Sequence, residues 1–119
     1  MKSLVTAVVT AYFFTAALAL CLMLGSTPAL AGDDAGIKPL YLKKCKVCHG
    51  PDGVGSKTGK KFGVPNFTDK EWQKTRDLAA ITGTITNGSA KNKRMKAFKG
   101  KLKPEEIDAL AKFVKAFGG

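Results

Sequence analysis

The chain has 119 residues, enough for one small domain and too few for a large multidomain enzyme. Its 20 lysines and arginines outnumber nine acidic residues, and the formal charge of +11 predicts a partner with an anionic surface. Beyond residue 31 there are two cysteines and one histidine, which excludes the four cysteine or histidine ligands of a structural zinc site.

Residues 1–31 have the pattern of a secretory signal peptide. Lys2 provides a basic start, residues 4–24 carry no charge, and the letters ALA at residues 29–31 form a small-residue cleavage site. We therefore predict cleavage after this site and a mature domain over residues 32–119, periplasmic or otherwise exported. The alternative is an uncleaved leader, because the apolar run is long enough to anchor the protein in a membrane.

The mature part is expected to be helical, since strand patterns are nearly absent from it. A first helix is predicted over residues 39–48, with Pro39 in its first turn, and a glycine-rich loop follows over residues 50–67. Thr68, with a glutamate three residues later, predicts a capping box and a short helix over residues 69–74.

A further helix is predicted over residues 76–87, and a loop rich in glycine and lysine over residues 88–103. The last helix begins with Pro104 at its first position and carries an apolar stripe as far as Phe117. The chain is thus expected to form three or four helices separated by long loops.

The letters CKVCH place Cys45, Cys48 and His49 on one face of a helix. Two thiols at this spacing can add to the vinyl groups of a porphyrin while the imidazole reaches its iron, so the pattern is typical of c-type haem attachment. A thioredoxin-like dithiol would need a βαβ unit, for which strands are missing. A structural disulfide is possible in an exported protein, but it would leave His49, the glycine-rich loops and the small core unexplained.

Met95 is the only methionine after residue 31, and no second histidine exists. It lies in a basic loop, where an apolar side chain needs something to bind. A thioether suits haem iron, so Met95 is the predicted second axial ligand.

The two segments together resemble class I cytochrome c of the small bacterial, single-haem kind. LYLKKCKVCHGPDGVGSKTGKKFGVPNF resembles the haem-binding helix and glycine loop of that family, and KRMKAFKGKLKPEEIDALAKFVKAF resembles its methionine loop and C-terminal helix. The resemblance covers about residues 36–117. It implies an all-α small cytochrome c fold, with three to four helices and long loops around one covalently bound haem c.

The resemblance also implies roles for individual residues. Cys45 and Cys48 would form the thioethers, His49 would be the proximal iron ligand and Met95 the distal one. The carbonyl of Pro65 would accept a hydrogen bond from the proximal histidine and fix its ring.

Aromatic residues have implied roles as well. Tyr41 and Phe113 match the contacts where the first and last helices cross. Phe62, Phe67 and Trp72 would either line the haem pocket or belong to the ordinary core.

An iron held by histidine and methionine has no open coordination site, so the protein is not expected to act as an enzyme. The predicted function is to carry one electron between two larger acidic redox proteins, a reductase and an oxidase. The protein is expected to be a monomer that binds no nucleic acid and associates with membranes only weakly or through its leader. Two alternatives are a haem enzyme or gas sensor with a labile methionine, and a haem-free CxxC thiol oxidoreductase. The predicted docking residues are Lys43, Lys44, Lys46, Lys91, Lys93, Arg94, Lys96 and Lys99.

Overall fold

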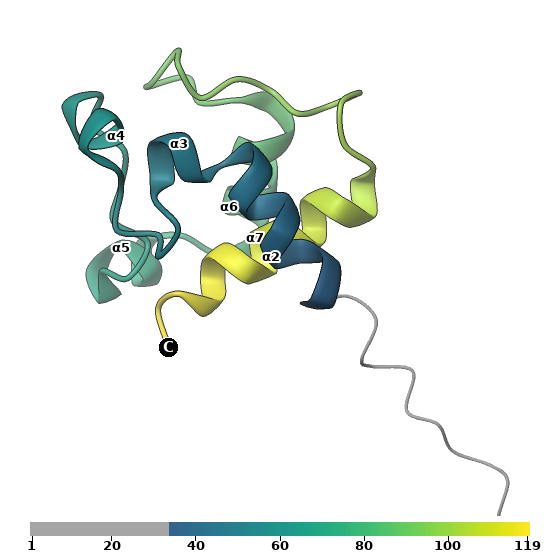
Figure 1. Cartoon of the computed structure of the whole chain (residues 1–119), viewed down its shortest axis with the longest axis horizontal. Coiled ribbons are helices and arrows are strands. Elements are labelled where there is room, and N and C mark those ends of the chain that lie inside the picture. The colour runs from purple at the N-terminus through teal and green to yellow at the C-terminus, as the bar shows by residue number, and fades with distance from the viewer. Residues whose placement is uncertain (1–33) are drawn as a thin grey trace, which may run out of the picture.

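The structure is a computed structural model that describes residues 34–119, so the predicted leader lies outside the described residues (Figure 1). Within this part the regular elements are helices, and the β pairing is limited to an isolated bridge between Lys99 and Leu102, which confirms the all-α prediction. No helix among the described residues is long and apolar enough to cross a membrane. The helices are α2 Asp34–Lys44, α3 Lys46–His49, α4 Lys57–Lys61, α5 Lys70–Thr75, α6 Leu78–Asn87 and α7 Pro104–Ala116.

Helix α7 contributes a large part of the core and begins at Pro104, as the sequence predicts. Pro104 occupies the first turn, and the Glu106 carboxylate accepts a hydrogen bond from the Lys103 backbone N–H at 2.8 Å. The apolar stripe of the helix is buried, including Leu110 and Val114, and it packs against α2 and α6.

Helix α2 crosses α7, as Figure 1 shows. Tyr41 is fully buried at the crossing, and the centroid of its ring lies 5.1 Å from that of Phe113 and 5.4 Å from that of Phe117. The predicted Tyr41–Phe113 contact is confirmed. Ile37, one turn earlier in α2, is buried in the same core.

The first helix differs from its prediction at both ends. It begins at Asp34, and Pro39 lies inside it rather than in its first turn. Proline lacks the N–H that would donate to the Ala35 carbonyl, so α2 loses one hydrogen bond in its second turn. The predicted helix over residues 39–48 is also divided at Cys45, and α3 begins at Lys46.

Two further differences concern short helices. Helix α4 was expected to be loop because it lies in the glycine-rich segment over residues 50–67 and contains Gly59. Helix α5 is capped by Asp69 and not by Thr68, since the Asp69 carboxylate accepts from the backbone N–H groups of Glu71 at 2.8 Å and Trp72 at 3.0 Å.

Candidate functional site

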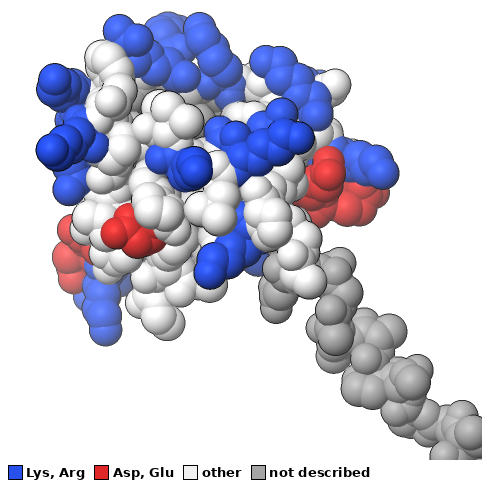
Figure 2. Space-filling view, in the orientation of Figure 1, with Lys and Arg blue, Asp and Glu red and all other residues white. Residues whose placement is uncertain are grey.

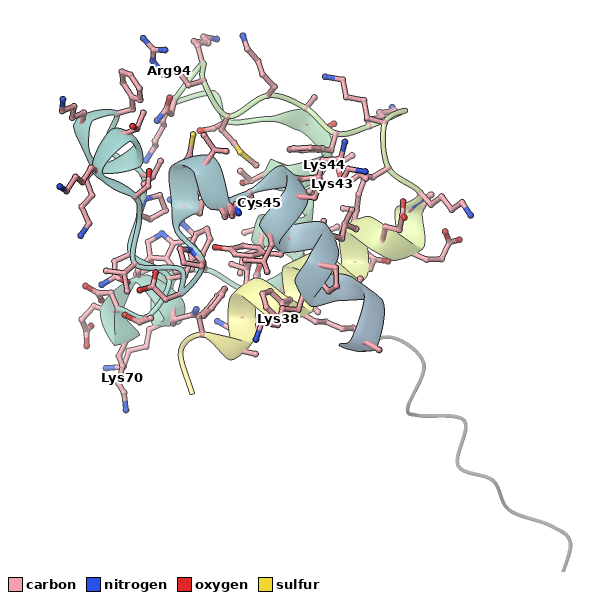
Figure 3. All side chains as sticks on the ribbon, in the orientation of Figure 1. Lys38, Lys43, Lys44, Cys45, Lys70 and Arg94 are labelled. Atoms are coloured by element: carbon pink, nitrogen blue, oxygen red, sulfur yellow. The ribbon has the colours of Figure 1, made fainter. Side chains whose placement is uncertain are left out.

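The two cysteines and the histidine of the CKVCH segment lie where α2 passes into α3. The backbone N–H of His49 donates to the Cys45 carbonyl at 2.9 Å, which keeps the segment helical across the division. The Cys45 and Cys48 thiols are free and partly buried, and both face the same cavity as His49. The predicted placement of all three side chains on one face is therefore confirmed, and Figure 3 labels Cys45 at this place.

Three neighbouring groups hold α3 in place. Ser56, the N-cap of α4, donates from its backbone N–H to the Cys48 carbonyl at 3.0 Å and from its hydroxyl to the Val47 carbonyl at 2.6 Å. The buried Tyr41 hydroxyl donates to the Gly50 carbonyl at 2.9 Å. Gly59 lies so close to α3 that a Cβ there would collide with the Cys48 carbonyl. The motif is thus fixed by contacts on several sides.

A cavity of about 750 Å³ opens beside α3. Its volume is within the range of small-molecule and cofactor sites, roughly 300–1,000 Å³. Helix α6 forms one wall of the cavity through buried apolar residues such as Ile81 and Ile85. Three aromatic residues were expected either to line a haem pocket or to belong to the core. All three line this cavity: Phe62, Phe67 and Trp72.

Met95 lines the same cavity from the segment that we call the Met95 loop, residues 88–99. Its backbone N–H donates to the Asn92 carbonyl and its own carbonyl accepts from the Ser89 N–H, both at 3.0 Å. Gly88 starts the loop with φ at 79°, a conformation that favours glycine. The loop ends against α6, where the Phe98 N–H donates to the Ile85 carbonyl at 3.0 Å.

His49 is held as a neutral imidazole. Burial lowers its pKa, because the charged form loses water without gaining a partner. Its ring stacks on Phe67 with centroids 4.6 Å apart, and Nδ1 is buried with no hydrogen-bond partner. The hydrogen bond expected to the Pro65 carbonyl is therefore not formed in this structure, although Pro65 lines the same cavity.

Burial also acts on the Cys45 thiol. It raises the pKa of Cys45 to about 11, with a smaller contribution from the charge of Cys48. A catalytic cysteine needs the opposite shift, because the thiolate is the nucleophile. Two neighbouring thiols, a neutral imidazole and a thioether around one cavity of cofactor size fit a covalently attached haem.

The predicted docking residues are all exposed. Figure 2 shows basic side chains gathered over the end of the molecule that carries α3, α4 and the Met95 loop, with acidic side chains mainly elsewhere on that view. Lys44, Lys91, Arg94 and Lys96 also line the cavity. Val47 is 67% exposed and adds an apolar side chain beside these charges.

Sequence reasoning missed three residues that shape the site. Gly59 and Ser56 were assigned to a featureless loop, and Asn92 to a basic one. Only Ser56 could have been found from local sequence, as a helix N-cap. Its hydroxyl accepts a hydrogen bond from the backbone N–H of Gly59, three residues later, at 2.9 Å. The roles of Gly59 and Asn92 depend on segments distant in sequence.

Comparison with known proteins places the site in a family. The family model described as cytochrome c oxidase, cbb3-type, subunit III, matches residues 32–114. The chain is 37% identical over 97 residues to the cbb3-type cytochrome c oxidase subunit FixP of Bradyrhizobium diazoefficiens, covering 81% of this chain and 32% of that protein. The chain therefore spans about a third of the length of such relatives.

Relatives of similar size are also found. Cytochrome c6 of Nostoc sp. is 39% identical over 92 residues, which cover 75% of each protein. Among solved structures, the KustC0563 c-type cytochrome is similar with a TM-score of 0.63 and 39% identity, over 69% of this chain and 96% of that one.

Proposed function

The chain belongs to the cbb3-type cytochrome c oxidase subunit III family of c-type cytochromes, which bind haem c covalently, and we propose that it is a one-electron carrier whose iron is held by His49 and Met95. The observation that supports this most is the convergence of Cys45, Cys48, His49 and Met95 on one cavity. The two thiols would form the thioether links to the haem, and the imidazole and the methionine sulfur would hold its iron.

The bound haem supplies an iron that changes between the ferrous and ferric states. The protein contributes a fixed ligand pair and an apolar wall that keeps water from the iron. Burial keeps His49 neutral, so its ring nitrogen can bind metal without first losing a proton. If His49 and Met95 both held the iron, no coordination site would remain for a substrate.

Native mass spectrometry and a pyridine haemochrome assay test the cofactor attachment, and carbon monoxide tests the axial ligands. We expect one haem per chain, attached through two thioethers, and a ferrous protein that does not readily bind carbon monoxide. Rapid carbon monoxide binding would favour the alternative of a gas sensor or haem enzyme. Absence of covalent haem would favour a thiol oxidoreductase.

The partner is proposed to be an acidic redox protein that docks on the basic end of the molecule. Lysines around the cavity would raise the encounter rate at low salt, and screening would remove the effect at high salt. Lys91→Gln together with Lys96→Gln should slow electron transfer to an acidic acceptor at low ionic strength and leave it unchanged at high ionic strength. Equal rates at low salt would contradict this docking face.

A second candidate is the electron-transfer domain of an oxidase assembly, outside the cytoplasm in either case. The names of the FixP and CcoP relatives favour it, but they describe proteins about three times longer. Affinity purification of the tagged chain from its native membranes would separate the two candidates. Co-purification of oxidase activity supports the assembly, and recovery of the chain alone supports the shuttle.

A further inference from the structure

We propose that Asn92, Arg94 and Phe62 form a clasp that holds Met95 on the iron, an inference that rests on the proposed ligation by Met95. Phe62 follows α4, and the other two residues precede Met95 in the Met95 loop. All three line the cavity, although Asn92 and Phe62 are 30 residues apart in sequence. The clasp therefore joins two separate segments of the cavity wall.

Asn92 uses both ends of its side chain. Its Nδ2 donates to the Phe62 carbonyl at 2.7 Å, and its Oδ1 accepts from the Arg94 backbone N–H at 3.1 Å. Its backbone carbonyl meanwhile accepts from the Met95 N–H at 3.0 Å. One residue thus links the turn that carries the sulfur to the facing segment of the wall, which makes it a positioning residue for Met95.

Arg94 makes the second link of the clasp. Its guanidinium carbon lies 3.7 Å from the centroid of the Phe62 ring, within the range of a cation–π contact. Figure 3 shows Arg94 on the side of the Met95 loop that faces α4. The Phe62 ring is 37% exposed, so this contact adds little to the buried core and acts mainly on the loop.

The clasp matters because the middle of the Met95 loop, residues 90–96, makes few other polar contacts with the rest of the described chain. Among the described residues, residues 90–96 make two polar contacts with another segment of the cavity wall, and both are to Phe62. One is the hydrogen bond from Asn92, and the other is the cation–π contact of Arg94. The remaining hydrogen bonds of these residues stay inside the loop, and the bonds to α6 begin only at Phe98. Loss of the clasp should therefore raise the population in which Met95 has left the iron.

Imidazole titration of the ferric holoprotein measures that population, because imidazole binds only where Met95 has left. Asn92→Ala removes a hydrogen bond across the cavity mouth, and we expect imidazole affinity to rise roughly threefold to tenfold. Phe62→Leu removes the ring face but keeps an apolar side chain, and we expect a rise of roughly twofold to fivefold. Neither substitution changes the charge near the iron.

Asn87→Ala is the matched control. Asn87 is an exposed asparagine at the end of α6, and its side chain makes no hydrogen bond to a described residue. Its substitution should leave imidazole affinity at the wild-type value. The clasp is overturned if Asn92→Ala and Phe62→Leu match this control, or if they lower the denaturant midpoint without raising imidazole affinity.

The outcome separates this inference from the proposed function. A wild-type protein that lacks covalent haem, or binds imidazole as readily as a Met95→Ala variant, would contradict the proposed function itself. A wild-type protein with covalent haem and weak imidazole binding, whose clasp variants behave like Asn87→Ala, would contradict the clasp alone.

Discussion

The motif region, residues 41–59, and the Met95 loop, residues 88–99, supply the two sides of the site but are held in different ways. The motif region is fixed by three kinds of contact: a buried tyrosine hydroxyl, a helix cap and a buried glycine packed on a carbonyl. The Met95 loop is attached to α6 at its ends and to Phe62 through the clasp. The side that bears the two thiols is therefore held by contacts on several sides, whereas the middle of the loop that bears Met95 is tied to the facing wall only through Phe62 among the described residues.

The largest expected effect comes from removing the covalent attachment. The double substitution Cys45→Ala and Cys48→Ala should abolish covalent haem completely, because these two thiols face the cavity, one from the turn between α2 and α3 and one from α3. Mass spectrometry under denaturing conditions should show the polypeptide mass alone. Haem that remained attached in this variant would contradict the proposed linkage.

The same contrast explains how much the sequence could predict. The CKVCH segment is local, so its spacing alone predicts three side chains on one face. Met95 was predicted as the second ligand by elimination, because beyond residue 31 the sequence has no other methionine and no histidine besides His49. The last helix was also predicted well, since Pro104 and a regular apolar stripe mark it.

What sequence reasoning missed depends on contacts between distant segments. Helix α4 lies in a glycine-rich segment where turn signals predict a loop, and its Gly59 is needed only because α3 lies against it. Asn92 resembles any polar loop residue until its partner, 30 residues earlier, is known. The capping of α5 by Asp69 instead of Thr68 was a choice between adjacent residues that local patterns cannot resolve.

The next largest effect tests the tight packing of the motif region. Gly59→Ala places a Cβ against the Cys48 carbonyl, and relief of this overlap should cost about 2 kcal/mol of the free energy of unfolding. Denaturant unfolding measures the loss. Gly36→Ala is the control: the site has no heavy atom within 4 Å, so stability should stay level or rise by up to about 0.5 kcal/mol. Equal free energies of unfolding for the two variants would contradict the close packing of Gly59 against the Cys48 carbonyl.

A smaller effect is expected from Tyr41→Phe. The ring stays in the helix crossing but the hydrogen bond to the Gly50 carbonyl is lost, which should cost about 1 kcal/mol near neutral pH. Burial raises the pKa of the Tyr41 hydroxyl well above its ordinary value of 10.0.

The raised pKa gives the Tyr41→Phe comparison a pH dependence. The folded state favours the neutral phenol, so this contribution to stability is complete below pH 10 and is lost as pH rises above it. The stability difference between wild type and variant should therefore shrink in that alkaline range. A difference that stayed constant from pH 7 to pH 11 would contradict the burial of this hydroxyl.

The most direct test of the central claim is a redox titration of the wild-type holoprotein beside Met95→Ala. The wild type should show a single one-electron transition, and the variant a potential lower by on the order of 0.1 V, within the span of roughly 0.8 V that axial ligands control. The variant should also gain carbon monoxide binding in the ferrous state. An unchanged potential and spectrum in Met95→Ala would contradict the assignment of Met95 as the ligand that makes this protein an electron carrier.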